Sequence, residues 1–232
     1  MMANPYAIHG PALISFSGGR TSAYMLRKIL DAHGGRLPDG VHVTFANTGR
    51  ERSETLDFVA ECEQRWSVRI VWLEWLPYDR QTPRDERYQV VNHNNASRDG
   101  EPFERLIDKR GFLPNPVTRF CTQELKVRTM RNYMQAQGYK SWTNAVGLRA
   151  DEPGRVLKST ARNNDGKDPW QTVTPMYEAG ATEQDVFAFW ADQPFDLQLQ
   201  SYEGNCDLCF LKGAGKISRI MRERPDLADW WI

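Results

Sequence analysis

Two groups of residues in this sequence have the chemical types and the spacing that a functional site needs. One is a glycine turn made of Ser17, Gly18, Gly19, Arg20, Thr21 and Ser22. The other is a Cys-x-x-Cys pair, Cys206 and Cys209, together with Cys121 far upstream. Backbone amides beside adjacent glycines approach an anion closely, and thiolates at this spacing hold a metal ion or cluster. The sequence therefore predicts an anion site and a metal or redox site.

The glycine turn lies between a predicted strand and a predicted helix. An apolar run at 12–16 precedes it, and apolar residues recur at helical spacing between Tyr24 and Leu30. A helix that starts after the glycines directs its positive dipole end at the turn, which favours phosphate. The turn lacks the lysine of the Walker motif and does not match G-x-G-x-x-G. Phosphate binding and a plain tight turn are both open interpretations at this point.

Composition limits the class of protein. A chain of 232 residues is long enough for one α/β domain with an appended region. The formal net charge is zero, so only a local basic patch could favour nucleic acid. No apolar run is long enough for a membrane span and no secretory leader is present, so we expect no membrane partner and a cytoplasmic location. The four cysteines favour a metal or redox site over a disulfide framework.

The elements that must position these residues alternate in type. Strand patterns at 41–46 and 68–75 flank a helix at 53–66, for which Ser53 is the expected N-cap. A polar insertion at about 76–120 follows, with a short helix near 104–109. A helix at 124–137 and a strand at 142–148 come next. This alternation predicts a Rossmann-like, doubly wound, mainly parallel sheet with helices on both faces.

Two regions of unequal size are expected. Residues 1–175 would form the nucleotide-binding α/β domain with its insertion, and 176–232 a helical region that carries the Cys-x-x-Cys and packs on the same domain. Thr182 with Asp185 three residues on predicts a capped helix in the second region. Because ligands bind at the carboxyl ends of parallel strands, Asn47, Thr48 and Gly49 are candidates at one strand end, as is Gly147 at another.

Several segments, taken in order, resemble the phosphoadenosine phosphosulfate (PAPS) reductase family of the adenine-nucleotide alpha-hydrolase superfamily, which includes the PP-loop ATP pyrophosphatases. These segments are 15–22, 47–51, 54–58, 147–152 and 172–176. The pyrophosphate loop of the superfamily reads S-G-G-x-D-S, and Thr21 stands here in place of the aspartate. A hydroxyl is a poorer Mg²⁺ ligand than a carboxylate, so the sequence favours nucleotide binding over ATP hydrolysis. Glu51 and Asp151 are the candidates for a substitute carboxylate.

The resemblance implies an adenine nucleotide, either ATP or a sulfonucleotide such as PAPS or adenosine phosphosulfate (APS), as ligand. The implied nucleotide-binding residues are Ser17, Gly18, Gly19, Arg20, Thr21, Ser22, Asn47, Thr48, Gly49, Glu51, Gly147 and Arg149. The planar guanidinium of Arg149 suits phosphate or sulfate. The alternative for Arg149 is a structural ion pair with Asp151 or Glu152.

A subset of sulfonucleotide reductases holds a four-iron cluster on paired cysteines and a downstream Cys-x-x-Cys. By resemblance, Cys121, Cys206 and Cys209 would hold a 4Fe-4S cluster with one iron open. A zinc ion, with His93 as a fourth ligand, and a reversible Cys206–Cys209 disulfide are the alternatives. Cys62 is expected in the core, because free cysteine behaves there as a small hydrophobe.

The function that the resemblance implies is iron-sulfur-dependent transfer or reduction of sulfur. The candidate catalytic residues are Cys121, Arg119 and Lys126. A nucleic-acid substrate, a sulfur- or electron-donor protein and a second copy of the chain are open as partners. One alternative is a PAPS or APS reductase that releases sulfite, although the sequence lacks the Glu-Cys-Gly-Leu-His motif of thioredoxin-dependent members. The other is a nucleotide-binding accessory subunit without turnover.

Overall fold

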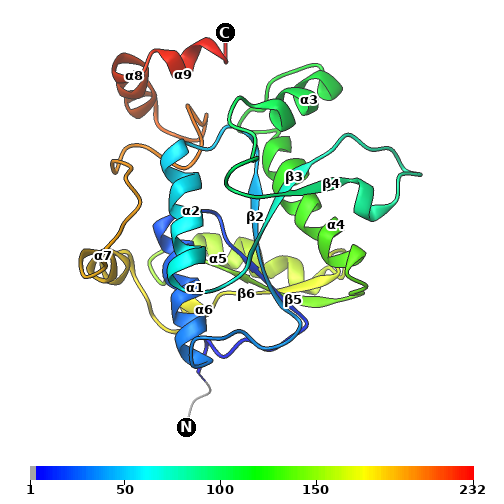
Figure 1. Cartoon of the computed structure of the whole chain (residues 1–232), viewed down its shortest axis with the longest axis vertical. Coiled ribbons are helices and arrows are strands. Elements are labelled where there is room, and N and C mark those ends of the chain that lie inside the picture. Colours follow the sequence, from blue (N-terminus) through cyan, green and yellow to red (C-terminus); the bar gives the residue numbers. More distant parts are fainter. Residues whose placement is uncertain (1–3) are drawn as a thin grey trace.

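A computed structural model describes residues 4–232 and places the strands in a single sheet (Figure 1). The strands are β1 (Ala12–Ser15), β2 (Val41–Asn47), β3 (Ile70–Trp75), β4 (Tyr88–Val91), β5 (Trp142–Val146) and β6 (Trp170–Val173). Their order across the sheet is β4-β3-β2-β1-β5-β6. Every neighbouring pair is parallel except β3 and β4, which are antiparallel. The predicted mainly parallel α/β class is confirmed.

The connections between strands are helical. The α-helices are α1 (Arg20–Ala32), α2 (Ser53–Arg65), α3 (Glu101–Arg110), α4 (Thr129–Ala136), α5 (Pro153–Thr160), α6 (Pro175–Glu178), α7 (Glu183–Ala191), α8 (Ala214–Glu223) and α9 (Asp226–Asp229). Short 3-10 turns, η1 (Arg84–Glu86) and η3 (Ala161–Asn164), and a π-helix, η2 (Cys121–Arg128), complete the set. None of the helices within residues 4–232 is long and apolar enough to cross a membrane.

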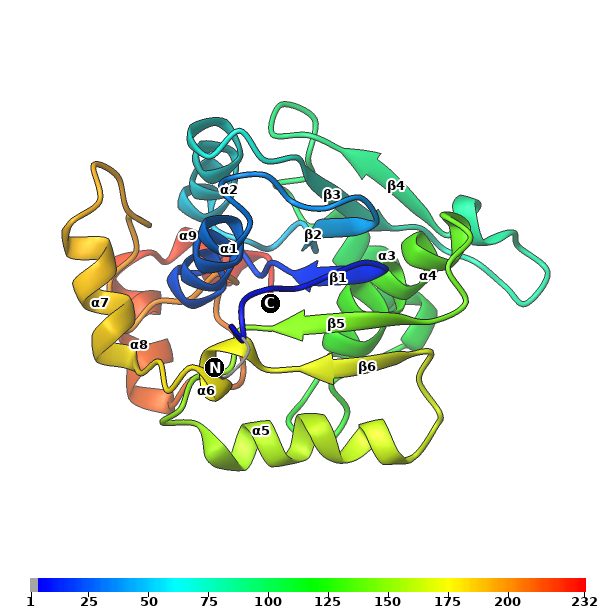
Figure 2. The same ribbon diagram turned by 90° about the horizontal axis from the view of Figure 1, so that it is seen from below.

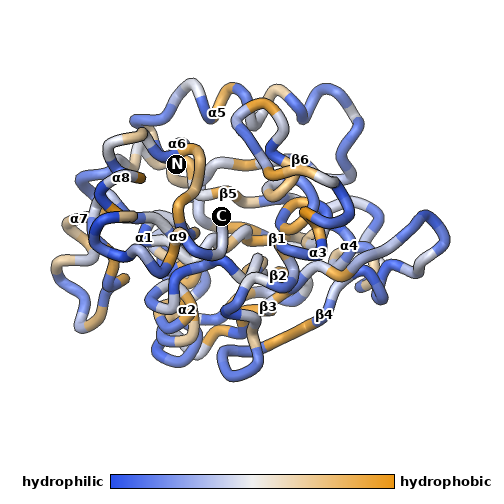
Figure 3. The backbone as a smooth tube through the Cα atoms, turned by 90° about the horizontal axis from the view of Figure 1, so that it is seen from above, coloured by the Kyte–Doolittle hydropathy of each residue, from blue (hydrophilic) through white to orange (hydrophobic). Residues whose placement is uncertain are grey.

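Alternation along the strands builds a core on each face of the sheet. Ile14, Phe45 and Trp72 belong to the cluster that includes the buried sides of α1 and α2. Leu13 and Leu73 belong to a separate cluster with the buried side of α4. Figure 2 shows α1 and α2 on one side of the strands and α4 on the other. Figure 3 shows hydrophobic segments gathered in the central strands and hydrophilic segments in the outer loops.

The strand order reverses between β1 and β5, because β2 and β3 follow on one side of β1 whereas β5 and β6 follow on the other. Ligands of open α/β sheets bind at such a switch point, beside the carboxyl ends of the strands. The arrowheads of β5 and β6 in Figure 2 point toward the side on which α7 and α8 lie. The segments 196–210 and the glycine turn meet at this edge of the sheet.

Several predicted boundaries were wrong. The insertion contains strand β4, whose Tyr88 and Val91 are buried against β3, and its helix is longer than expected. The helix predicted from Glu124 begins at Cys121 as η2 and continues into α4. Strand β3 starts two residues later and β5 ends two residues earlier than predicted.

Two predicted caps have different outcomes. Ser53 is the first residue of α2, and Arg52 occupies the cap position without a side-chain cap, so the Ser53 prediction was wrong. At α7 the Thr182 backbone amide donates to the Asp185 carboxylate at 2.7 Å, and the Thr182 hydroxyl accepts from the Asp185 amide, so this capping box is confirmed. The Cys62 side chain is fully buried in the core, as predicted.

Candidate functional site

The glycine turn has a geometry that only glycine supplies at its second position. Gly18 has a φ of +77°, and a Cβ there would lie 2.7 Å from Thr55 Cγ2. The Ser17 amide donates to Ser22 Oγ at 3.2 Å, and Ser22 Oγ donates to the Gly19 carbonyl at 2.9 Å. These bonds hold the turn against the N-terminus of α1, whose first amides have no partner inside the helix.

The end of β5 lies directly against this turn. A Cβ on Gly147 would lie 3.3 Å from Ser22 Cα, so a side chain at this position would push the strand end away from α1. The structure therefore brings Gly147 together with the glycine turn at the switch point of the sheet. Glycine is required here for close approach rather than for a positive φ.

A cavity of about 420 Å³ opens beside the turn. Its lining includes four of the predicted nucleotide-binding residues, which are Gly19, Arg20, Thr21 and Arg149. Helix α7 and the segment from Leu197 to Asn205 form its other walls. The volume is within the range of small-molecule sites, which measure roughly 300–1,000 Å³.

Both arginines at this cavity are already paired. Arg20 makes two bonds of 2.7 Å to the carboxylate of Asp196, so it anchors the C-terminal region to α1. Arg149 Nε lies 2.9 Å from Asp151 Oδ1, and Glu152 also accepts from its backbone amide. The structure thus shows Arg149 in the ion pair that the sequence offered as an alternative. Arg149 also lines the cavity.

The residues after β2 hold the strand end in place. The Asn47 amide group donates to Glu74 at 2.7 Å and to the Ser97 carbonyl at 2.9 Å, while its oxygen accepts from the Gly49 amide. Gly49 has a φ of +80°, and a Cβ on it would lie 2.6 Å from Ser97 Oγ. Asn47 and Gly49 were expected beside the nucleotide, but their visible contacts are structural.

Glu51 belongs to the cysteine site. Its side chain is fully buried, and one carboxylate oxygen accepts from the amide and the hydroxyl of Thr48 at 2.7 Å each. The other oxygen lies 3.0 Å from Lys126 Nζ and 3.4 Å from Cys206 Sγ. Lys126 Nζ is also 3.8 Å from Cys206 Sγ. Glu51 was a candidate for a substitute carboxylate at the turn, and the structure places its two oxygens against Thr48 and Lys126.

The charges of this group favour a cationic lysine beside a thiol. Burial acts to lower the pKa of Lys126, but the neighbouring Cys206 and Glu51 outweigh it and raise that pKa above its usual value. Burial raises the pKa of the Cys206 thiol to about 12, against the opposing charge of Lys126. Burial also raises the pKa of Cys121. Both thiols are therefore protonated at neutral pH until a metal displaces the proton.

A short antiparallel bridge between Glu51 and Cys206 attaches the Cys-x-x-Cys to the end of β2. The Arg52 amide donates to the Asn205 carbonyl at 2.7 Å, and the Asp207 amide donates to the Arg50 carbonyl at 2.9 Å.

Side-chain ion pairs reinforce the bridge. Arg50 lies 2.5 Å from the carboxylate of Asp207, and Arg52 lies 2.8 Å from that of Glu203. Sequence reasoning missed these four residues. Glu203 before Cys206 and Asp207 after it are acidic, and these two residues could have indicated the ion pairs.

A cavity of about 140 Å³ brings the three predicted metal ligands together. Cys121, Cys206 and Cys209 all line it, and Lys126 and Thr48 contribute polar groups. Phe103, Phe210, Leu211 and Trp231 supply its apolar wall. Buried Arg50 Nε and Asp207 Oδ1, from two further lining residues, have no hydrogen-bond partner within residues 4–232. The site has thiol ligands, an apolar wall and unsatisfied polar atoms, which fit a bound inorganic group.

The alternatives to a cluster are a zinc ion with His93 as a ligand and a reversible Cys206–Cys209 disulfide. No group of three or more His, Cys, Asp or Glu side chains in the described part of the chain is arranged to hold a metal ion. His93, the suggested zinc ligand, instead lies 2.6 Å from Asp57 and packs at the edge of Trp72. Cys206 and Cys209 are both free thiols.

The comparisons with known proteins give relatives without a stated activity. No protein-family model matches the chain. Protein MJ0066 of Methanocaldococcus jannaschii, described as uncharacterized, is 22% identical over 227 residues, which cover 97% of this chain and 41% of that protein. The chain thus spans about two-fifths of the archaeal protein.

A solved structure, the U34-tRNA thiolase NcsA of Methanococcus maripaludis with its 4Fe-4S cluster, aligns with a TM-score of 0.48 and 11% identity. The alignment covers 94% of this chain and 66% of the thiolase chain, or just under two thirds of its length. Similarity at this level transfers neither a family nor a reaction.

The relationship to a phage protein is stronger. The nin region protein ORF290 of Escherichia phage lambda, also described as uncharacterized, is 31% identical over 232 residues. The aligned part covers 93% of this chain and 71% of the phage protein. Identity at this level, sustained over nearly the whole chain, is shared descent: this chain belongs to the family of the phage lambda nin region protein ORF290.

Proposed function

We propose that this chain is a PP-loop enzyme related to the PAPS reductases, which binds an adenine nucleotide at the glycine turn and transfers or reduces sulfur with an iron-sulfur cluster. The cluster would be held by Cys121, Cys206 and Cys209. The order of motifs in the sequence, the parallel sheet with its switch point and the shared cysteine cavity support this assignment.

The observation that carries the proposal is that the two sites share a wall. Asn205 Nδ2 donates to the Ser17 carbonyl at 2.6 Å, and the next residue, Cys206, pairs with Glu51. Gly204 and Asn205 line the cavity at the turn, whereas Cys206 and Asp207 line the cysteine cavity. A nucleotide-activated group on one side of segment 203–207 therefore lies beside the sulfur chemistry on the other.

The residues of the chain have separate parts in this proposal. The turn amides and the N-terminus of α1 bind the phosphates. Glu51 holds Lys126, whose ammonium group stabilises the thiolate form of Cys206. Phe103 and Trp231 keep water from the cysteines. When bound, a 4Fe-4S cluster with three protein ligands supplies an iron that is open to sulfide or substrate.

The lining of the cavity at the glycine turn supports binding of the nucleotide more strongly than its cleavage. Thr21 provides a hydroxyl in place of the superfamily carboxylate, and Asp151 is held by Arg149. Glu183 and Glu203 line the cavity, but Glu183 lies 3.6 Å from Arg149 and Glu203 is paired with Arg52. Either ATP or a sulfonucleotide is compatible with these donors. Measurement of pyrophosphate release from ATP, and of sulfite release from PAPS and APS with a dithiol, distinguishes the sulfurtransferase from the reductase.

The cluster is tested by anaerobic purification. We expect a brown protein that contains iron and acid-labile sulfide, and we expect Cys121→Ala, Cys206→Ala and Cys209→Ala each to lose both. Cys62→Ala removes the remaining thiol, which is buried in the core and does not line the cavity, and should retain the cluster. A colourless anaerobic protein that contains zinc, or equal iron loss in Cys62→Ala and Cys206→Ala, would contradict the proposal.

A further inference from the structure

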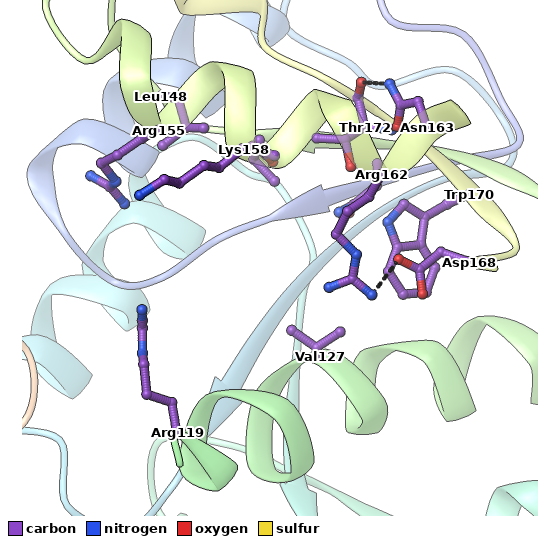
Figure 4. Close-up of a pocket in the computed structure, with 13 residues that line it drawn as sticks. Arg119, Val127, Leu148, Arg155, Lys158, Arg162, Asn163, Asp168, Trp170 and Thr172 are labelled. Atoms are coloured by element: carbon purple, nitrogen blue, oxygen red, sulfur yellow. Dashed lines mark hydrogen bonds and ion pairs between the residues drawn. The ribbon is translucent and has the colours of Figure 1, made fainter. Parts of the chain in front are cut away.

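A separate cavity, which we call the α5 cleft, opens over strands β5 and β6. It has a volume of about 460 Å³ and lies between η2 and α5 (Figure 4). Asn144 and Trp170, from the two strands, contribute to its floor, and Arg119, Arg155, Lys158 and Arg162 contribute to its walls. The cleft shares no lining residue with the cavity at the glycine turn or with the cysteine cavity.

The walls of the α5 cleft carry positive charge on both sides. Arg119, which lies two residues before the start of η2, reaches toward Arg155 and Lys158 on the opposite wall in Figure 4. Cations that face one another across a cleft repel, and the low-dielectric walls strengthen the field between them. An anion placed between the walls removes that repulsion.

Only part of this charge is compensated by the protein. Arg155 pairs with Glu152, and Arg162 pairs with Asp168 at 2.8 Å. Arg119 and Lys158, both exposed, make no ion pair with any residue in the range 4–232. A cleft with two unpaired cations on opposite walls has a net attraction for anionic ligands.

The spacing of the cations favours an extended anion. Arg155, Lys158 and Arg162 are three and four residues apart, so they lie along one side of α5 and η3. At a rise of 1.5 Å per residue they form a row about 10 Å long. Trp170, which packs against Trp142 at 5.5 Å, provides an aromatic surface beside the row. Proteins that bind single-stranded nucleic acid combine a row of cations with aromatic rings on which bases stack.

The α5 cleft and the cysteine cavity lie on opposite sides of one element. Arg119 and Val127 line the cleft, while Cys121 and Lys126 line the cysteine cavity. Helix η2 is therefore the partition between a cationic surface and the cysteines.

We propose that the α5 cleft binds the phosphodiester backbone of a single-stranded nucleic acid segment. The phosphates lie along Arg155, Lys158 and Arg162, and Arg119 closes the cleft from the other wall. Identification of the bound strand as the sulfur acceptor rests on the proposed function, whereas its binding does not.

The test is the anisotropy of a labelled single-stranded oligonucleotide, titrated with the wild-type chain at several salt concentrations. We expect Lys158→Glu to weaken binding roughly tenfold at low salt and to reduce the slope of log K against log salt by about 0.7. Lys158→Arg keeps the positive charge, so it should retain the wild-type affinity and the wild-type salt slope. Lys140→Glu, an exposed lysine before the amino end of β5, serves as the matched control and should change binding less than about twofold.

Several results would overturn this inference. Equal weakening of binding by Lys158→Glu and Lys140→Glu would show that the oligonucleotide does not bind in the cleft. A mononucleotide that binds as tightly as the oligonucleotide, and that loses affinity to the same extent in Lys158→Glu, would identify a small-molecule site in the cleft instead. Thermal unfolding checks folding, since substitutions of exposed residues change Tm by only about 2 °C.

Iron content and nucleotide binding, measured on the same wild-type preparations, separate this inference from the proposed function. Oligonucleotide binding by a protein without iron would contradict only the proposal that the cysteines hold a cluster. Iron and nucleotide binding without oligonucleotide binding would contradict only the proposal that the α5 cleft binds nucleic acid.

Discussion

Glu51 is the residue that joins the end of β2 to the cysteines. Its buried carboxylate is satisfied by Thr48 and Lys126, and it lies within hydrogen-bonding distance of the Cys206 thiol. A buried carboxylate without such partners would be costly. The site therefore depends on one anion and one cation that stabilise each other, and replacement of either leaves the other uncompensated.

At the same scale, Gly18 should tolerate substitution poorly. We expect Gly18→Ala to lower the free energy of unfolding by about 2–4 kcal/mol, because the added Cβ meets Thr55 in addition to the cost of a positive φ. Gly34→Ala is the matched control, since Gly34 also has a positive φ but has no atom within 4 Å of the added Cβ. It should cost only about 1 kcal/mol. Urea denaturation measures both values.

Nucleotide binding gives a second readout for these variants. Calorimetric titration should show that Gly34→Ala binds as the wild type does and that folded Gly18→Ala has lost affinity. Equal stability losses in the two variants would mean that the contact with Thr55 relaxes without cost.

The sequence pointed to residues that the structure places at two cavities. Gly19 of the turn lines one and the three cysteines line the other, because a strand-turn-helix and a Cys-x-x-Cys are local signals. The partner of Arg20 was not predictable in the same way. Asp196 is far from Arg20 along the chain, so only the folded structure shows that the pair forms.

At the scale of elements, the segment 196–207 is fastened to the sheet by paired side chains. Asp196 binds Arg20, and Glu203 and Asp207 bind the two arginines after β2. The segment has no regular secondary structure apart from its bridge to Glu51. These ion pairs take the place of a hydrogen-bonded ladder.

We expect Asp196→Asn to loosen this segment. The substitution removes the charge that two bonds from Arg20 satisfy, so the free energy of unfolding should fall by about 1 kcal/mol. Limited proteolysis should cut within 192–207 sooner than in the wild type. Asp31→Asn, which breaks an exposed pair with Arg27 on the same helix, should cost less than about 0.5 kcal/mol and leave proteolysis unchanged. Equal cleavage rates in the two variants would show that Arg20 does not hold the segment.

The elements themselves followed the sequence pattern wherever the pattern was long. Helices α1 and α2 and strands β1, β2, β3 and β5 were predicted from the apolar pattern, with shifts at their ends. Strand β4 was missed because it has four residues and its two central side chains are exposed, so pairing with β3 rather than local propensity forms it. The π-helical start of the helix at Cys121 has no signal in the apolar pattern.

At the scale of the whole molecule, the residues after α8 pack back over the site. Trp230 stacks on the Arg50 guanidinium at 4.5 Å and meets Phe103, while Trp231 lines the cysteine cavity. A Cβ on Gly100 would lie 2.8 Å from Trp230. Distant parts of the chain thus form one wall around the cysteines.

Removal of this wall should expose a bound cluster. We expect Trp231→Ala to admit water and oxygen to the cavity and to accelerate bleaching of the cluster absorbance in air several-fold. Ile232→Ala is the matched control, because that side chain is 99% exposed and leaves the wall intact. Identical bleaching rates in the two variants would show that Trp231 does not protect the cysteines.

The segment 203–207 is part of two cavities, and this has a thermodynamic consequence. A ligand that shifts Asn205 away from Ser17 also moves Cys206, which is the next residue and is paired with Glu51. The affinity of either cavity then depends on the occupancy of the other, and linkage requires the two effects to be equal in free energy. Occupancy of the nucleotide cavity and the redox or sulfur state of the cysteines would thus be coupled through the five residues of segment 203–207.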